Sequence, residues 1–327
     1  MKERDRFVDI AKGLGILLIV CIHTEVFDVI GMPLVFIAVP VFFYMSGFYD
    51  HSERAFSQWL PKSFRTLIIP AVIWVLIGTA YIKFLGYLRD RSWGENPFSL
   101  YDLAGGNGPA WFLFALFYAK MILGCIEHLK LPKVIYGGAI LGIGYIGMYV
   151  NLPLFIDEGF LALPLYAAGK NIFPRVKGLF VNKWILLAGV FAFVVYLLHW
   201  CSFVIVPGRS HFEPDYFVSF VVILLVFFPY LWISQKLEKI TMLSDLGKRS
   251  LGIMLLHAPM CHTAAVILNR MFEKGSLMWI LSFLLIYFVI VALSYWLTCL
   301  IERYCSIMLG KKSKYKMCDG KSKIEVC

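Results

Sequence analysis

The first strongly apolar segment of the chain contains a histidine. Residues 17–27 read LLIVCIHTEVF, so His23 and its two polar neighbours interrupt a run that is otherwise hydrocarbon. An imidazole can exchange a proton near neutral pH. An ionisable side chain at membrane depth is costly unless it faces a polar cavity, so His23 is a candidate catalytic residue. The alternative is a neutral histidine that only hydrogen-bonds to a neighbouring helix.

Cationic residues precede this histidine and its neighbouring span. Lys12 lies eleven residues before His23, which on a helix is about 16 Å along the axis and nearly the same face. Lys62 and Arg65, in LPKSFRTLIIP, stand just before a later apolar run. Together the three cations predict a cradle for a phosphate-bearing ligand. The alternative is ordinary anchoring of membrane helices by positive charge.

A second imidazole is expected at a similar depth. His257 follows Arg249 by about 12 Å of helix in LGKRSLGIMLLHAPM, so two histidines on different helices could share one cavity. Glu25, two positions after His23, should point away from that ring.

Small and aromatic residues mark two further helices. Ser46 and Gly47, in VPVFFYMSGFY, permit close approach of another backbone or of a narrow ligand. Trp111 follows the Gly-rich stretch GGNGPA at the start of an apolar run, the usual place of an interfacial tryptophan. We expect these three residues and His257 to line the cavity.

The composition predicts the elements that position these residues. The chain has 327 residues, of which 60% are hydrophobic and only 16% charged, against about 25% charged in soluble domains. Several apolar stretches are long enough to cross a bilayer as helices, and no cleavage site follows the first. The fold class is therefore an all-α polytopic integral membrane protein with about ten transmembrane helices, expected over 13–31, 33–49, 66–88, 109–127, 133–150, 153–169, 183–206, 215–234, 249–269 and 277–301.

The charge distribution gives an orientation. The chain carries 31 Lys and Arg residues and a net charge of +10. Most of these cations lie before the first span, in alternate loops and in the tail, which places both termini in the cytoplasm. The five cations of the outer loops are Arg89, Arg91, Arg209, Arg270 and Lys274. The positive charge thus reports orientation and contact with membrane lipids, and no nucleic-acid partner is expected.

We expect one membrane domain, residues 1–302, followed by a basic cytoplasmic tail, 303–327, that is disordered or surface-bound. The eight cysteines show no paired or metal-ligand spacing, so neither disulfides nor a metal site is expected. The outer loop 89–108 suggests a lid or an acceptor-binding surface.

Five segments, in their order, carry a resemblance to a known family: DIAKGLGILLIVCIHT, VPVFFYMSGFY, FRTLIIPAVIW, WFLFALF and LGKRSLGIMLLH. The chain resembles the acyltransferase 3 family of bacterial membrane O-acyltransferases. Within it, the chain is similar to members of the enterobacterial common antigen O-acetyltransferase and fucose 4-O-acetylase-like groups. The resemblance extends over the first nine spans.

The resemblance implies transfer of an acetyl or other acyl group from cytoplasmic acyl-CoA to a hydroxyl of a cell-envelope sugar, polysaccharide or glycolipid. It implies location in the bacterial cytoplasmic (inner) membrane. Some relatives carry an additional SGNH-hydrolase domain, which nothing in this sequence encodes, so the chemistry must finish inside the membrane domain.

The family's functional residues map onto this chain one by one. The family histidine of the first helix matches His23, as general base or as transient acyl carrier. The family arginine before it is replaced by Lys12, which keeps the charge but loses bidentate geometry. The family's other motif residues match Arg65, Ser46, Gly47 and Trp111.

Two other classes of function fit the same composition. A transporter or flippase for a small anion or lipid-linked sugar would also have buried polar residues and a basic mouth. A non-catalytic assembly partner of an envelope pathway is the third class. Dependence on acyl-CoA separates the enzyme from both. The acceptor and the oligomeric state stay open.

Overall fold

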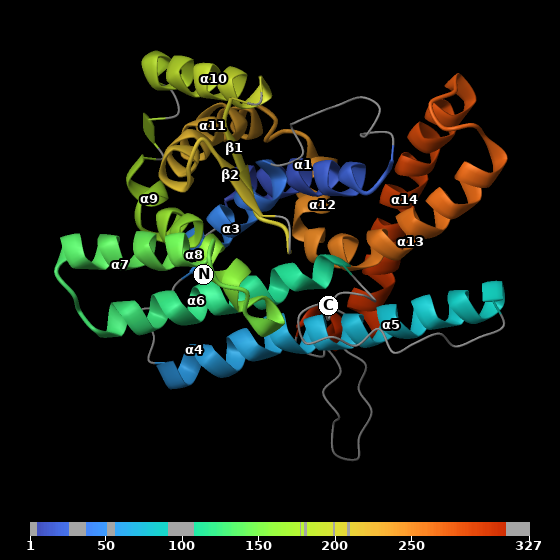
Figure 1. Cartoon of the computed structure of the whole chain (residues 1–327), viewed down its shortest axis with the longest axis horizontal. Helices are drawn as coiled ribbons and strands as arrows, with labels where there is room; N and C mark the ends of the chain where they lie inside the picture. Colours follow the sequence, from blue (N-terminus) through green and yellow to red (C-terminus); the bar gives the residue numbers. More distant parts are fainter. Residues whose placement is uncertain are drawn as a thin grey trace.

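The computed structural model is predominantly helical (Figure 1), and it describes residues 5–25, 37–50, 56–90, 108–176, 178–179, 182–198, 200–207 and 210–311. In chain order the helices are α1 (Arg6–Ile22), α3 (Ala38–Phe48), α4 (Phe56–Ser63), α5 (Ile69–Asp90), α6 (Trp111–His128), α7 (Lys133–Ile146), α8 (Ile156–Asn171), α9 (Phe173–Val176), α10 (Lys183–Leu197), α11 (Tyr216–Lys236), α12 (Thr241–Lys248), α13 (Ser250–Met271) and α14 (Leu277–Tyr304). A π-helical segment, Phe64–Ile68, joins α4 to α5.

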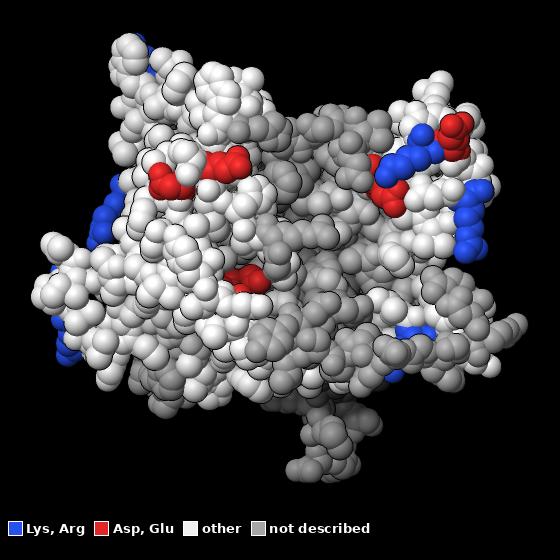
Figure 2. Space-filling model, in the orientation of Figure 1, with Lys and Arg blue, Asp and Glu red and all other residues white. Residues whose placement is uncertain are grey.

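Five helical segments of the described chain are long and apolar enough to cross a membrane. They are Trp59–Leu88, Gly108–His128, Tyr216–Lys236, Ser250–Met271 and Leu277–Tyr304. On the face in Figure 2, uncharged side chains cover most of the described surface, and the visible Lys and Arg lie toward its left and right margins. This distribution suits a helical membrane protein.

The other predicted spans are shorter in the structure. Helix α3 has 11 residues and α7 has 14, which correspond to about 17 and 21 Å, less than the roughly 30 Å of hydrocarbon in a bilayer. The count of ten spans therefore stays a prediction.

Several predicted boundaries were wrong. The first span was expected over 13–31, but α1 begins at Arg6 and ends at Ile22. The helix continues through polar positions because they lie against other helices; Asp9, for example, is 1% exposed. Residues 26–31 of that prediction lie outside the described part.

A second correction concerns the span expected over 183–206. Helix α10 ends at Leu197, and β1 (Ser202–Val204) then pairs antiparallel with β2 (His211–Glu213), with Ser202 opposite Glu213. Each strand has only three residues, which is too short for an alternation of polar and apolar side chains to be recognised in the sequence. The strands therefore could not be distinguished from the apolar run before them. The short helix α12 was likewise not predicted as an element of its own, because only eight residues form it.

The N-terminal helix packs most extensively on α12, and it also contacts α3, α11 and α13. At the α1–α12 crossing two glycines face the other helix's backbone. A Cβ on Gly13 would overlap the carbonyl oxygen of Leu243, and one on Gly247 would overlap that of Asp9. Only glycine permits this separation, so the crossing fixes where α1 lies.

A second crossing of the same type joins α3 to α8. A Cβ on Gly47 would overlap the carbonyl oxygen of Tyr166, and one on Gly169 would overlap that of Tyr44. The prediction that Gly47 permits close approach of another backbone is confirmed, and that backbone is α8.

The first part of the predicted tail is ordered against the helices. Helix α14 extends to Tyr304, and a 3₁₀ turn, Ser306–Leu309, follows. The indole Nε1 of Trp74 donates to the carbonyl oxygen of Met308 at 2.9 Å, which ties this turn to α5. Residues 312–327 lie outside the described part.

We predict that Gly169→Ala and Gly247→Ala each lower the free energy of unfolding by about 1–3 kcal/mol, because an added methyl must push two backbones apart. Gly142→Ala is the matched control, since nothing lies within 4 Å of the added carbon; it should be neutral or stabilising by up to about 1 kcal/mol. Thermal unfolding in detergent measures all three. Equal melting temperatures for the three variants would contradict the close-crossing interpretation.

Candidate functional site

The two histidines predicted to share a cavity are in contact. The ring centroids of His23 and His257 lie 4.9 Å apart, with an interplanar angle of 58°. His23 directly follows the last residue of α1, while His257 lies within α13. Residues 234 positions apart in the chain are thus brought together by the packing of α1 on α13.

His257 is oriented by its own helix. It is completely buried, and its Nδ1 lies 3.0 Å from the carbonyl oxygen of Ile253. A carbonyl oxygen only accepts, so Nδ1 must carry the hydrogen and Nε2 of the neutral ring holds a lone pair. This Nε2 has no hydrogen-bond partner among the described residues. The site therefore contains a buried acceptor beside the second imidazole.

His23 differs from its partner in accessibility. Protein atoms surround it densely, yet its side chain retains exposed surface. His23 is thus the exposed member of the pair, whereas His257 is completely buried.

The end of α1 is held in place by side chains of α13 and α14. Glu25 Oε2 accepts a hydrogen bond from Asn269 Nδ2 at 2.9 Å, and Asn269 Oδ1 accepts from Trp279 Nε1 at 2.7 Å. Lys274 lies 3.8 Å from the same carboxylate oxygen. Glu25 is thus engaged by α13, as expected if it points away from His23. The roles of Asn269 and Trp279 had no signal in the sequence.

The remaining cavity candidates lie in different surroundings. Gly47 is buried in the contact with α8, and Ser46 beside it is half-buried. Trp111 is only 9% exposed and lies against Phe43, with ring centroids 6.3 Å apart. It is therefore packed inside the helices rather than at a lipid interface, because α3 and α13 cover the start of α6.

The three predicted phosphate-binding cations come from three elements: Lys12 from α1, Lys62 from α4 and Arg65 from the π-helical segment. The Nζ of Lys12 sits 5.2 Å from the ring centroid of Tyr49, at the end of α3. Lys62, on α4, is exposed, and Arg65 lies in the π-helical segment that packs on α6. The Nε of Arg65 is buried without a hydrogen-bond partner among the described residues. An unpaired buried donor of this kind is available for an anion.

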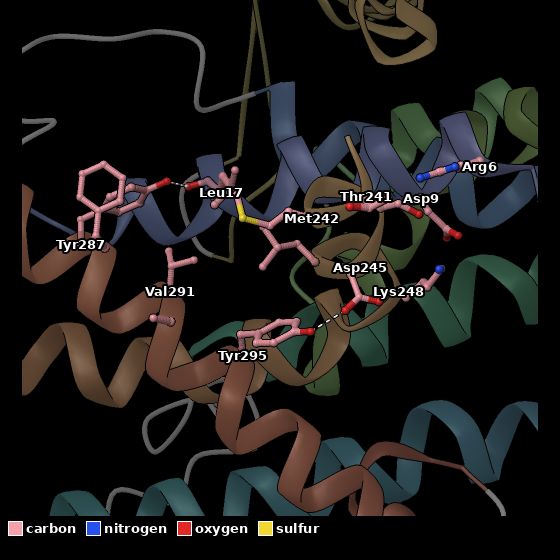
Figure 3. A pocket seen from close by; sticks show the side chains of 14 residues that line it. Arg6, Asp9, Leu17, Thr241, Met242, Asp245, Lys248, Tyr287, Val291 and Tyr295 are labelled. Carbon is pink, nitrogen blue, oxygen red and sulfur yellow. Dashed lines mark hydrogen bonds between the residues drawn. The ribbon is translucent and has the colours of Figure 1, made fainter. Parts of the chain in front are cut away.

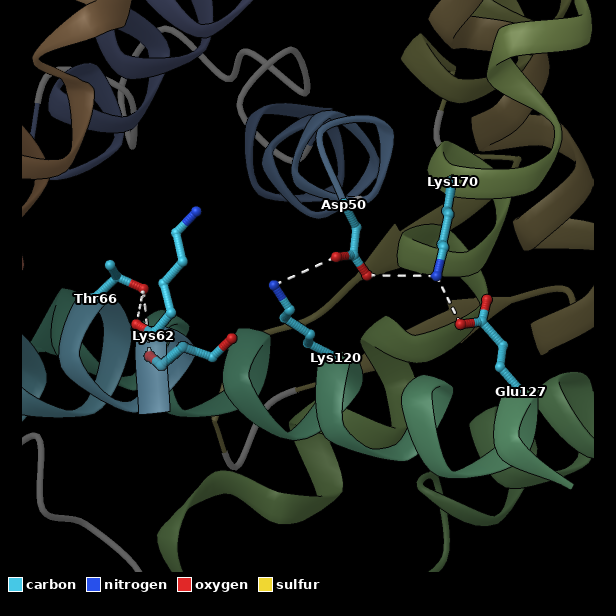
Figure 4. Close-up of polar contacts among 7 residues, drawn as sticks. Asp50, Lys62, Thr66, Lys120, Glu127 and Lys170 are labelled. Carbon is cyan, nitrogen blue, oxygen red and sulfur yellow. Dashed lines mark hydrogen bonds and ion pairs between the residues drawn. The ribbon is translucent and has the colours of Figure 1, made fainter. Parts of the chain in front are cut away.

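A partly buried charge cluster, which had no signal in the sequence, lies at the end of α3. The Asp50 side chain is 4% exposed and lies 3.3 Å from Lys120 and 3.6 Å from Lys170 (Figure 4). Lys170 also pairs with Glu127 at 2.6 Å. The two negative and two positive charges of the cluster balance. Its ion pairs join the end of α3 to α6 and α8. Figure 4 shows Lys62 projecting toward the same region.

No group of three or more His, Cys, Asp or Glu side chains that could bind a metal is found in the described part of the chain. The chemistry that these residues offer is proton transfer or acyl transfer by imidazole.

We predict that Asp50→Asn lowers the free energy of unfolding by about 3–5 kcal/mol, because it leaves two lysines facing each other without their shared carboxylate. The double variant with Lys120→Gln should recover part of this loss, since Lys170 keeps Glu127. Lys274→Gln removes an exposed pair and should cost less than about 1 kcal/mol. Melting temperatures of purified variants measure the differences; a wild-type value for Asp50→Asn would show that the cluster does not stabilise the fold.

Comparison with known proteins gives one family match. No curated protein and no solved structure shows significant similarity to the chain. The family model Acyl_transf_3, described as an acyltransferase domain, matches residues 5–299, nearly the whole chain and both histidines. The chain therefore belongs to the acyltransferase 3 family and is a membrane acyltransferase.

Proposed function

We propose that the protein transfers an acetyl group, or another short acyl group, from cytoplasmic acyl-CoA to a hydroxyl of an envelope sugar, polysaccharide or glycolipid. The observation that carries this proposal is the contact between the accessible His23 and the buried His257 in a chain of the acyltransferase 3 family. The site would lie in the cytoplasmic membrane of a bacterium, with ten spans and both chain ends in the cytoplasm.

In the proposed reaction the acceptor hydroxyl attacks the thioester carbonyl carbon. A carbon–oxygen bond forms, the carbon–sulfur bond breaks, and the hydroxyl proton passes through His23 to the departing thiolate. His23 acts as general base and then as general acid. In the other route, a nitrogen of His23 attacks the thioester carbonyl carbon: a carbon–nitrogen bond forms, the carbon–sulfur bond breaks, and CoA leaves as the thiol with the imidazole proton. The acceptor hydroxyl then attacks the acyl-imidazole, the carbon–nitrogen bond breaks, and the hydroxyl proton passes to the imidazole.

His257 has a positioning role in this proposal. Its Nε2 lone pair lies in a ring that contacts His23, and Ile253 fixes the tautomer. An N–H of His23 that donates to Nε2 would leave the other nitrogen of His23 unprotonated and able to accept a proton. This arrangement replaces the carboxylate that orients the base in many hydrolases.

The proposed donor site uses Lys12, Lys62 and Arg65. Arg65 supports it most directly, because its buried Nε lacks a partner among the described residues. Lys12 lies about 16 Å along α1 from His23, comparable with an extended pantetheine arm. Nucleotide phosphates at these cations would leave the thioester near the imidazole.

We predict that acetyl-CoA raises the melting temperature of the purified protein in a saturable way, since it binds the folded state only. Lys12→Ala and Arg65→Ala should each require about tenfold more acetyl-CoA for the same rise. Lys133→Ala, an exposed cation at the start of α7, is the control and should behave as wild type. No shift at millimolar acetyl-CoA in folded protein would refute the donor assignment and favour the transport alternative.

We predict that His23→Ala lowers acyl transfer by about 10²- to 10⁴-fold while acetyl-CoA binding is kept, as expected for loss of a general base. His257→Gln should have a smaller effect on rate and should shift the pH dependence of the reaction. His262→Gln, at an exposed position of the same helix, is the control. The measurement is transfer of labelled acetyl groups to envelope glycans in membranes that contain each variant; normal transfer by His23→Ala would rule out this mechanism.

A further inference from the structure

A groove of about 980 Å³ lies between α1, α12 and α14 (Figure 3), apart from the residues assigned above to catalysis and donor binding. Its lining residues are Arg6, Asp9, Leu17, Thr241, Met242, Ser244, Asp245, Leu246, Lys248, Tyr287, Phe288, Val291, Ala292 and Tyr295. One end carries charged side chains and the other is almost entirely apolar. The groove is therefore shaped for an amphiphile.

Two cations at the charged end are available to a ligand. Arg6 and Lys248 are exposed, and neither forms an ion pair with another described residue. The carboxylate of Asp245, by contrast, accepts a hydrogen bond from Tyr295 and forms an ion pair with Arg249. The Tyr295 hydrogen bond, with the positive charges of Arg249 and Lys248, lowers the pKa of Asp245. Asp9 also lines this end of the groove but is only 1% exposed. The accessible charge is thus positive, which suits a phosphate.

A buried hydroxyl at the same end adds a polar contact. Ser244 is 2% exposed, lines the groove, and its Oγ has no hydrogen-bond partner among the described residues. A hydroxyl left unsatisfied in this way is costly unless a ligand or water supplies an acceptor. A phosphate or ester oxygen of a bound molecule would do so.

The other end of the groove is suited to hydrocarbon. Leu17, Val291 and Ala292 line it, and Tyr287 already donates its hydroxyl to the carbonyl oxygen of Leu17 at 3.3 Å. The walls include Phe288, 65% exposed, on α14. Only 22% of the apolar window of α14 is buried inside the protein, so this helix presents most of its surface to lipid. The groove consequently opens toward the bilayer.

We propose that this groove binds a membrane phospholipid, with the phosphate between Arg6 and Lys248 and one acyl chain along Leu17, Phe288 and Val291. The charges require an anionic group at one end, and the apolar walls require hydrocarbon at the other. Acyl-CoA meets the first requirement, but the two amides of its pantetheine arm would find no free polar partner among the described residues at the apolar end. The site is independent of acyl transfer, and it would hold α1, the helix that leads to His23, against α12 and α14.

The experiment uses the full-length protein in mixed micelles with phosphatidylglycerol that carries a photoreactive diazirine on its acyl chain. Labelled peptides are mapped by mass spectrometry. We expect saturable labelling of 241–248 and 287–295. Unlabelled phosphatidylglycerol should compete, while diacylglycerol with the same chains, which lacks the phosphate, should not.

Variants distinguish specific binding in the groove from labelling by the surrounding lipid. Arg6→Gln and Lys248→Gln should each weaken competition about fivefold, the effect of one cation near a headgroup, whereas Lys133→Gln should not. Ala292→Trp should block labelling by filling the groove, in protein that retains a single gel-filtration peak. Equal competition by diacylglycerol would overturn the proposal, and so would unchanged labelling in a variant that carries both Arg6→Gln and Lys248→Gln. Displacement of the lipid by acetyl-CoA would also overturn it and would make the groove a donor site.

Discussion

The site depends on how closely α1 can approach its neighbours. Gly13 and Gly247 let α1 and α12 cross with backbone against backbone, and the only side chain that fits at either position is a hydrogen atom. In a bilayer such contacts stabilise helix association because lipid tails solvate apolar side chains as well as protein does. The crossing sets the axial position of α1, and hence where His23, at its end, meets α13.

Polar groups between the helices need hydrogen-bond or ion-pair partners. Most of them are paired: Asp50 with two lysines, Glu25 with Asn269, and the hydroxyl of Tyr230 with the carbonyl oxygen of Ala11. Each pair offsets the cost of removing a polar group from water. The Nε2 of His257, the Nε of Arg65 and the Oγ of Ser244 are among the buried polar atoms that no described residue satisfies. Unsatisfied groups of this type are expected where a protein binds something else.

The charges also divide into two kinds. The cluster of Asp50, Lys120, Glu127 and Lys170 is neutral as a whole and joins three helices. Arg6 and Lys248 lie at the mouth of a groove without such partners. Substitution of a residue in the ion-paired cluster is expected to change the stability of the protein. Substitution of Arg6 or Lys248 is expected to change the affinity for a ligand. The two groups could not be told apart by counting charges, since both consist of ordinary lysines and acids.

The sequence by itself determined the class of the protein and its central residue. Long apolar runs require membrane helices, and a histidine within one of them is costly enough to need a reason, so His23 could be selected without a structure. The shared depth of His23 and His257 could also be predicted, because rise along a helix is constant. The close glycine contact of Gly47 followed from residue size.

Only the tertiary structure decided which helices touch. Rotation and tilt of one helix relative to another are set by side-chain packing between residues far apart in the chain, and periodicity within one helix does not contain that information. For this reason the buried pairing of Asp50, the anchoring of Glu25 by Asn269, and the amphiphilic groove beside α1 had no sequence signal. The start of α1 at Arg6 could not be predicted for the same reason. Asp9 and Lys12 lie within the helix because residues of neighbouring helices pack against them.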